Sequence, residues 1–150
     1  MEANPVIEML GRRLRLAVIG GGPGSFIGAM HRAAARLDDR YEIVAGVLSS
    51  DPERSATAAA GLGITPDRAY ATAESLFAAE QARQDGADVV AIMTPNDSHH
   101  SYAVGALRHG FDVICDKPIT NTLTEAVDVL ATVEDTGLVF CLTHNYTGYP

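Results

Sequence analysis

The chain has 150 residues, a formal net charge of −8 at pH 7 and 47% hydrophobic residues. That length fits one domain with a sizeable core. Because the chain is acidic without a basic stripe, and its apolar runs are too short to cross a bilayer, we expect neither nucleic-acid nor membrane partners.

Residues 1–13 read as an N-terminal extension. They lack the apolar core and the cleavage site of a secretory signal peptide. Cys115 and Cys141 each lie in an apolar run, and both are expected to be buried free thiols. This cysteine usage indicates a reduced, cytoplasmic protein.

Apolar runs alternate with helix signals from residue 14 onward. Two capping boxes are predicted, at Ser50 with Glu53 and at Thr122 with Glu125. Helices are expected at 25–37, 50–63, 72–83 and 122–137, and residues 95–110 are expected to form a turn and then a helix that ends at Gly110. Buried strands are expected at 14–20, 41–48, 86–94, 111–116 and 138–144, with a short edge strand at 68–71.

Strands that are apolar on both faces and alternate with helices indicate a parallel sheet covered on both sides. The predicted fold class is therefore α/β: a doubly wound parallel sheet in three α/β/α layers, the Rossmann fold. One nucleotide-binding domain is assigned to residues 14–150.

The stretch GGGPGSFIGAMH, residues 20–31, joins the first strand to the first helix. Glycines there let backbone N–H groups and the helix N-terminus approach a diphosphate. Ser25 stands where the usual fingerprint has its third glycine, and Gly28 supplies a late one, so the loop is expected to differ in shape. The predicted cofactor contacts are Gly20, Gly22, Gly24, Ser25, Phe26 and Ile27.

The end of the second strand bears on the choice of dinucleotide. An acidic residue there usually binds the adenosine ribose diol. Here Ser49 and Ser50 occupy that place as predicted cofactor contacts, and Asp51 comes slightly late. The serines with Arg54 would tolerate a 2′-phosphate, whereas Asp51 could bind the diol, so NAD and NADP both stay open.

Three segments, AVIGGGPGSFIGAMH, AIMTPNDSHHSYAVGALRHGFDVICDKPIT and THNYTGYP, resemble the glucose-fructose oxidoreductase, inositol dehydrogenase and MocA (Gfo/Idh/MocA) family. The resemblance covers residues 14–150, the N-terminal half of that family. It implies an oxidoreductase that moves hydride between NAD or NADP and a secondary hydroxyl of a sugar or polyol. It also implies a homo-oligomeric parent enzyme. Members usually have Glu where this chain has Asp116.

The resemblance assigns the chemistry to Lys117, the single lysine in the chain. It implies that this ammonium lies beside the nicotinamide ribose and the substrate hydroxyl, and that the Lys117–Pro118 bond is cis. Further cofactor contacts implied by the resemblance are Thr94, Pro95, Asn96, His99, Asp116 and Asn145.

The histidines do not form a predicted metal site. The spacing of His99, His100 and His109 puts no two of them on one helix face with a further ligand. His99 could also serve as a hydrogen-bonding residue at the start of its helix. His31 is expected to pack or cap within the first helix.

Members of the family continue into a second domain that supplies the substrate pocket and a catalytic histidine. That domain is absent from this chain, which is therefore expected to be inactive alone. A stand-alone dinucleotide-binding or redox-sensing module without catalysis is the alternative.

Overall fold

The computed structural model describes residues 4–148. The ends of two predicted segments, residues 1–3 of the extension and 149–150 of the domain, lie outside the described residues. The helices are α1 Pro5–Leu10, α2 Phe26–Leu37, α3 Pro52–Gly61, α4 Ala73–Ala82, α5 His99–Arg108 and α6 Leu123–Thr136; the strands are β1 Leu14–Gly20, β2 Tyr41–Val47, β3 Val89–Met93, β4 Asp112–Asp116 and β5 Phe140–Thr143.

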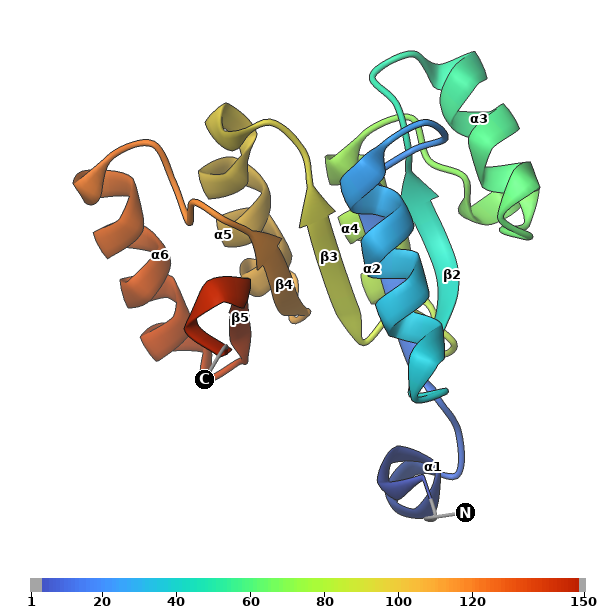
Figure 1. The fold of residues 1–150 in the computed structure, drawn as a ribbon, viewed down its shortest axis with the longest axis horizontal. Coiled ribbons are helices and arrows are strands. Elements are labelled where there is room, and N and C mark those ends of the chain that lie inside the picture. Colours follow the sequence, from blue (N-terminus) through green and yellow to red (C-terminus); the bar gives the residue numbers. More distant parts are fainter. Residues whose placement is uncertain (1–3, 149–150) are drawn as a thin grey trace.

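The five strands form one parallel sheet in the order β2-β1-β3-β4-β5, which confirms the predicted doubly wound fold. Strand order reverses between β1 and β3, where such sheets bind ligands beyond the carboxyl ends of their strands. Figure 1 shows α2 in front of the sheet and α4 and α5 behind it.

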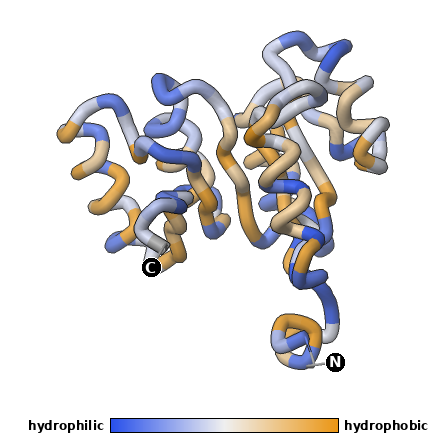
Figure 2. The backbone as a smooth tube through the Cα atoms, viewed as in Figure 1, coloured by the Kyte–Doolittle hydropathy of each residue, from blue (hydrophilic) through white to orange (hydrophobic). Residues whose placement is uncertain are grey.

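Two apolar clusters fill the space between the sheet and its helices. One packs β-strand residues such as Ile19, Ile92 and Val113 against α4, α5 and α6. The other packs Leu16 and Ala91 on the opposite face, against α2 and α3. Every residue of β3 is buried, and Figure 2 shows this central strand as an apolar stretch.

The predicted edge strand at 68–71 is wrong: it reduces to a single bridge between Gly46 and Ala69. Residues Pro66–Arg68 form a 3₁₀ turn, and the Arg68 side chain turns inward, where it forms a buried ion pair with Glu80. Because of this turn and this ion pair, the segment does not continue alongside β2 as a strand.

Local signals explain the helix boundaries. The capping box of Thr122 with Glu125 is confirmed. The box predicted for Ser50 with Glu53 is wrong, because Asp51 is the N-cap of α3 and its carboxylate accepts the Arg54 N–H. The extension also contains the short helix α1, capped by the Asn4 side chain.

The cysteine prediction is confirmed for Cys115 and wrong for Cys141, which is exposed. In the sheet register Cys141 pairs with Ile114, on the face turned away from the Phe140 and α6 contact. Among residues 4–148 no helix is long and apolar enough to cross a membrane.

Candidate functional site

The loop after β1 is shaped by glycines that have no room for a side chain. A Cβ on Gly22 would lie 2.3 Å from the Leu48 carbonyl oxygen, and one on Gly28 would lie 2.0 Å from the Gly21 oxygen. Gly28 therefore provides the close packing of helix on loop that the third fingerprint glycine usually provides. Ser25 is instead the N-cap of α2, with its Oγ accepting the Gly28 N–H at 3.1 Å.

The N-terminus of α2 can bind an anion at its first turn. Phe26 and Ile27 begin the helix, so their N–H groups have no intrahelical acceptor. The helix dipole adds a partial positive charge at the same end. Phe26 is exposed, and Gly24 before it has φ 85°; apart from its two chain neighbours, no residue between 4 and 148 comes within 4 Å of a Cβ built on it. This arrangement fits the diphosphate of a dinucleotide.

A hollow of about 590 Å³ lies at the carboxyl ends of β1, β2 and β3. It brings together three segments that the sequence had marked separately: the glycine loop, the serines after β2 and the turn after β3. Its lining includes Gly20, Gly21, Ser49, Ser50, Thr94 and Pro95.

A second hollow, of about 560 Å³, lies on the other side of the loop, against α3. Gly22, Ser49, Arg32 and Arg54 are among the residues that line it. The Asp51 carboxylate caps α3 through the Arg54 N–H at 3.0 Å, and the Ser49 Oγ accepts the Asp51 N–H at 3.1 Å. The Asp51 carboxylate therefore already accepts a hydrogen bond from α3, whereas Ser49 and Ser50 line the hollows.

His99 joins the turn after β3 to the turn after β4. Its side chain is fully buried, with Nδ1 2.8 Å from the Pro118 carbonyl oxygen and Nε2 2.9 Å from the Thr94 carbonyl oxygen. Ser98 donates to the Thr94 hydroxyl at 2.7 Å. Each ring nitrogen of His99 therefore contacts a backbone carbonyl, one in the turn after β3 and one in the turn after β4. The ring fixes these two turns relative to each other.

The turn after β4 carries Lys117, and the Lys117–Pro118 peptide bond is cis, as expected. Lys117 is exposed, and no hydrogen bond or ion pair joins its ammonium to any residue between 4 and 148. Lys117, Asn96 and Phe26 lie outside the lining of the hollows described so far. Asn96 is exposed at the start of the turn after β3.

The Asp116 side chain is held by two elements that flank β4. Its Oδ1 accepts a hydrogen bond from His31 Nε2 of α2 at 2.8 Å and another from the Thr143 hydroxyl of β5 at 2.8 Å. Partial burial works to raise the pKa of Asp116, but these two hydrogen bonds outweigh it and hold that pKa below its usual value. The carboxylate is therefore ionised at neutral pH, and the ring nitrogen of His31 is the donor.

The contact between His31 and Asp116 was missed at the sequence level, where His31 was assigned a role inside its own helix. The signal for it is the spacing from Gly28. Residues three apart share a helix face, and Gly28 marks the face of α2 that packs on the loop after β1.

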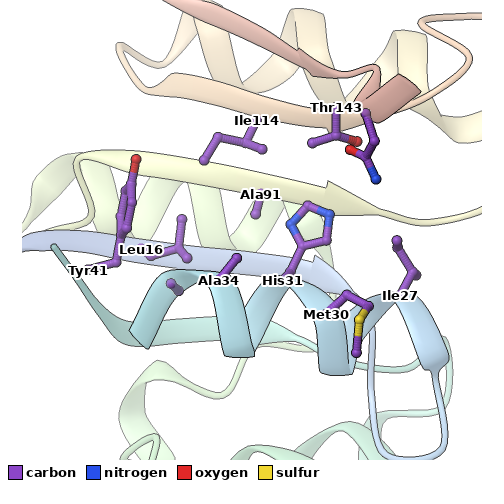
Figure 3. A pocket seen from close by; sticks show the side chains of 11 residues that line it. Leu16, Ile27, Met30, His31, Ala34, Tyr41, Ala91, Ile114 and Thr143 are labelled. Atoms are coloured by element: carbon purple, nitrogen blue, oxygen red, sulfur yellow. The ribbon is translucent and has the colours of Figure 1, made fainter. Parts of the chain in front are cut away.

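A third hollow, of about 260 Å³, lies between α2 and the sheet beside this contact. Figure 3 shows the His31 ring extending from α2 toward Thr143, with Ile27 and Met30 on the same helix. The predicted cofactor contact Asn145 lies at the same hollow, after β5.

A family model described as an oxidoreductase family with an NAD-binding Rossmann fold matches residues 14–144. The chain is 36% identical over 142 residues to YfiI, an uncharacterised oxidoreductase of Bacillus subtilis, covering 94% of this chain and 36% of that protein. It is 34% identical over 139 residues to D-apiose dehydrogenase of Paraburkholderia graminis, covering 93% of this chain and 34% of that enzyme.

Solved structures of similar fold are also oxidoreductases or dehydrogenase homologues. An inositol dehydrogenase homologue from Azotobacter vinelandii in complex with NAD⁺ superposes with a TM-score of 0.89 at 36% identity, covering 92% of this chain and 36% of that one. An oxidoreductase from Sinorhizobium meliloti superposes with a TM-score of 0.87 at 47% identity, covering 93% of this chain and 39% of that one. The chain thus spans little more than a third of the length of these relatives.

Proposed function

This chain belongs to the Gfo/Idh/MocA family of oxidoreductases as an NAD-binding Rossmann domain, and on that premise we propose that it holds the dinucleotide for hydride transfer to or from a secondary hydroxyl of a sugar or polyol. The substrate class is supported by two relatives. One is the D-apiose dehydrogenase. The other is the Azotobacter vinelandii inositol dehydrogenase homologue, also solved with NADH and myo-inositol. The activity and substrate of the whole protein are part of the proposal.

One observation supports the cofactor site above all: the glycine loop, Ser49 and Thr94 line a single hollow at the carboxyl edge of the sheet. Ligands of doubly wound sheets bind at this edge. The free N–H groups of Phe26 and Ile27 would bind the diphosphate, and the serines after β2 would face the adenosine ribose.

The remaining proposed role belongs to Lys117, which follows β4 at the same edge of the sheet. When bound, the nicotinamide ring accepts or donates the hydride. Lys117 would donate a hydrogen bond to the oxygen of the reacting hydroxyl and stabilise the negative charge that develops there. A compact ammonium suits this role better than a guanidinium, because it donates to two groups from one point.

The test is to titrate the chain with NAD⁺, NADH, NADP⁺ and NADPH by calorimetry, and to assay polyol-dependent reduction of NAD⁺ with a full-length protein that contains this chain. We expect binding of at least one nicotinamide dinucleotide by the chain and turnover by the full-length protein. Lack of binding to all four at about millimolar concentration would overturn the cofactor site. Binding without turnover of any sugar or polyol would favour a redox-sensing module.

A further inference from the structure

Lys117 follows directly after an ionised carboxylate, yet the two side chains do not pair. Asp116 ends β4, and its Oδ1 is engaged by His31 and Thr143. The ammonium of Lys117 has no partner among residues 4–148. A lysine side chain is long and flexible enough to reach a neighbouring carboxylate, and the contacts of Asp116 show how the two are separated here.

The sheet provides the first part of the separation. Consecutive side chains of a strand point to opposite faces. Cys115 lies in the cluster that packs against α5 and α6, so Asp116 points to the other face, where α2 lies. There it pairs in register with Thr143 of β5.

Two donors then fix the carboxylate on that face. His31 Nε2 and the Thr143 hydroxyl both lie 2.8 Å from the same oxygen, and the side chains of Asp116 and His31 are each only 13% exposed. His31 is placed by the contact of Gly28 with Gly21 one turn earlier in α2. The helix that begins at the glycine loop therefore also determines where the Asp116 carboxylate points.

We infer that His31 and Thr143 are positioning residues that hold the Asp116 carboxylate away from Lys117 and so keep the Lys117 ammonium unpaired. The inference rests on the role proposed for Lys117. It assigns no contact with substrate or cofactor to His31 or Thr143, which act through Asp116. An ammonium paired with Asp116 would be less able to donate to a substrate hydroxyl, because the carboxylate would occupy its donors.

The single lysine of the chain makes this inference measurable without any ligand. The readout is the rate at which trinitrobenzenesulfonate modifies Lys117, followed by peptide mapping so that the N-terminal amine is counted separately. Replacing His31 by Leu removes the donor and puts an apolar side chain of similar size in its place. The freed carboxylate should then pair with Lys117 and slow its modification about two- to fivefold, the scale of an exposed ion pair.

Three further variants separate this effect from a general structural one. His31→Gln keeps an N–H donor near the Nε2 position and should restore the wild-type rate. The double variant His31→Leu with Asp116→Asn should react as fast as Asp116→Asn alone, because no carboxylate remains to pair with Lys117. Thr143→Val removes the second donor with little change of shape and should slow modification as well. This variant tests the inference even if His31→Leu does not fold.

Unchanged modification rates in His31→Leu and Thr143→Val, with both proteins folded by circular dichroism, would overturn the inference. Slowing that persists in the double variant would also overturn it, since the effect would not pass through Asp116. The assay contains no dinucleotide, so its result is independent of whether the wild-type chain binds NADH, which tests the proposed function.

Discussion

The Nδ1 atom of His99 lies 2.8 Å from the carbonyl oxygen of Pro118, so a side chain at the start of α5 supports the turn that follows β4. The other ring nitrogen meets the Thr94 carbonyl oxygen at 2.9 Å. This buried ring joins the two turns that bear the proposed cofactor contacts and the proposed catalytic residue.

Replacing His99 by Ala should lower the free energy of unfolding by about 2–4 kcal/mol, because it leaves two backbone carbonyls without their partner and opens a cavity. Urea unfolding followed by circular dichroism measures the change. His144→Ala is the matched control, since that side chain is exposed and should be replaced at little cost. Equal stability of His99→Ala and wild type would show that the ring does not hold the turns.

Replacing Lys117 by Arg should lower turnover of a full-length protein containing this chain by about 10²-fold or more, the usual scale for a positioned group in proton-transfer catalysis. The side chain is exposed, so the melting temperature should hardly change. NADH affinity should fall much less than turnover, because the diphosphate is bound at the glycine loop. Steady-state kinetics beside a thermal melt provide the comparison. Near-normal turnover in the variant would remove Lys117 from the chemistry.

Replacing Gly22 by Ala should weaken NADH binding by about tenfold or more, since a Cβ at 2.3 Å from the Leu48 oxygen forces the loop to move. Calorimetry gives the affinity. Gly24→Ala is a useful comparison, because among residues 4–148 a Cβ there meets nothing within 4 Å beyond its chain neighbours. Any loss then comes from its φ of 85° or from the ligand itself. Undiminished affinity in Gly22→Ala would place the diphosphate elsewhere.

Replacing Ser49 by Asp should shift the preference toward NAD, because a carboxylate there would repel a 2′-phosphate. Ser49 lines both hollows beside the loop, which makes it the best-placed residue to act on the adenosine ribose. The ratio of the NADH and NADPH dissociation constants is the measurement, and Ser50→Asp tests whether the neighbouring serine has the same effect. A ratio that stays the same in Ser49→Asp would mean that the ribose does not bind beside this residue.

The pKa of Asp116 predicts a loss of stability in acid. The pKa of Asp116 is lower in the folded state than in the unfolded state. The ionised carboxylate therefore contributes its full stabilisation above about pH 4, the usual pKa of an unfolded Asp. That stabilisation is lost as the pH falls through the folded-state pKa. Asp116→Asn should therefore show a flatter decline in the free energy of unfolding between about pH 5 and pH 2. Urea unfolding at several pH values tests this. Parallel curves for the two proteins would contradict it.

The alternation of strands and helices could be predicted because it depends on local signals. Buried parallel strands are apolar on both faces, and Thr72 and Thr122 begin their helices with side-chain caps that the sequence displays. The segment at 68–71 was mistaken for a strand because the deciding interaction is distant. Arg68 turns inward to Glu80, which lies on α4, and no local pattern reveals that pair.

The same distinction between local and distant interactions decides which parts of the site could be predicted from the sequence. The glycine loop and the Asp-Lys-Pro turn lie within short segments, so their residues could be named in advance. The bond between His31 and Asp116 joins residues from α2 and β4, and its length depends on how the helix packs on the sheet. The exposure of Cys141 likewise depends on which face of β5 the neighbouring helix covers, and an apolar run does not show this.

The strand order also bears on how the chain folds as it leaves the ribosome. β1 pairs with β2 on one edge and with β3 on the other, yet α3 and α4 are both translated before β3. During that interval the edge of β1 that will face Val89–Met93 has no partner from its own sheet, and open apolar edges promote association with other chains. The central position of β1 thus leaves this edge unpaired until β3 is made, and the outer edge of β3 then stays open until β4 follows.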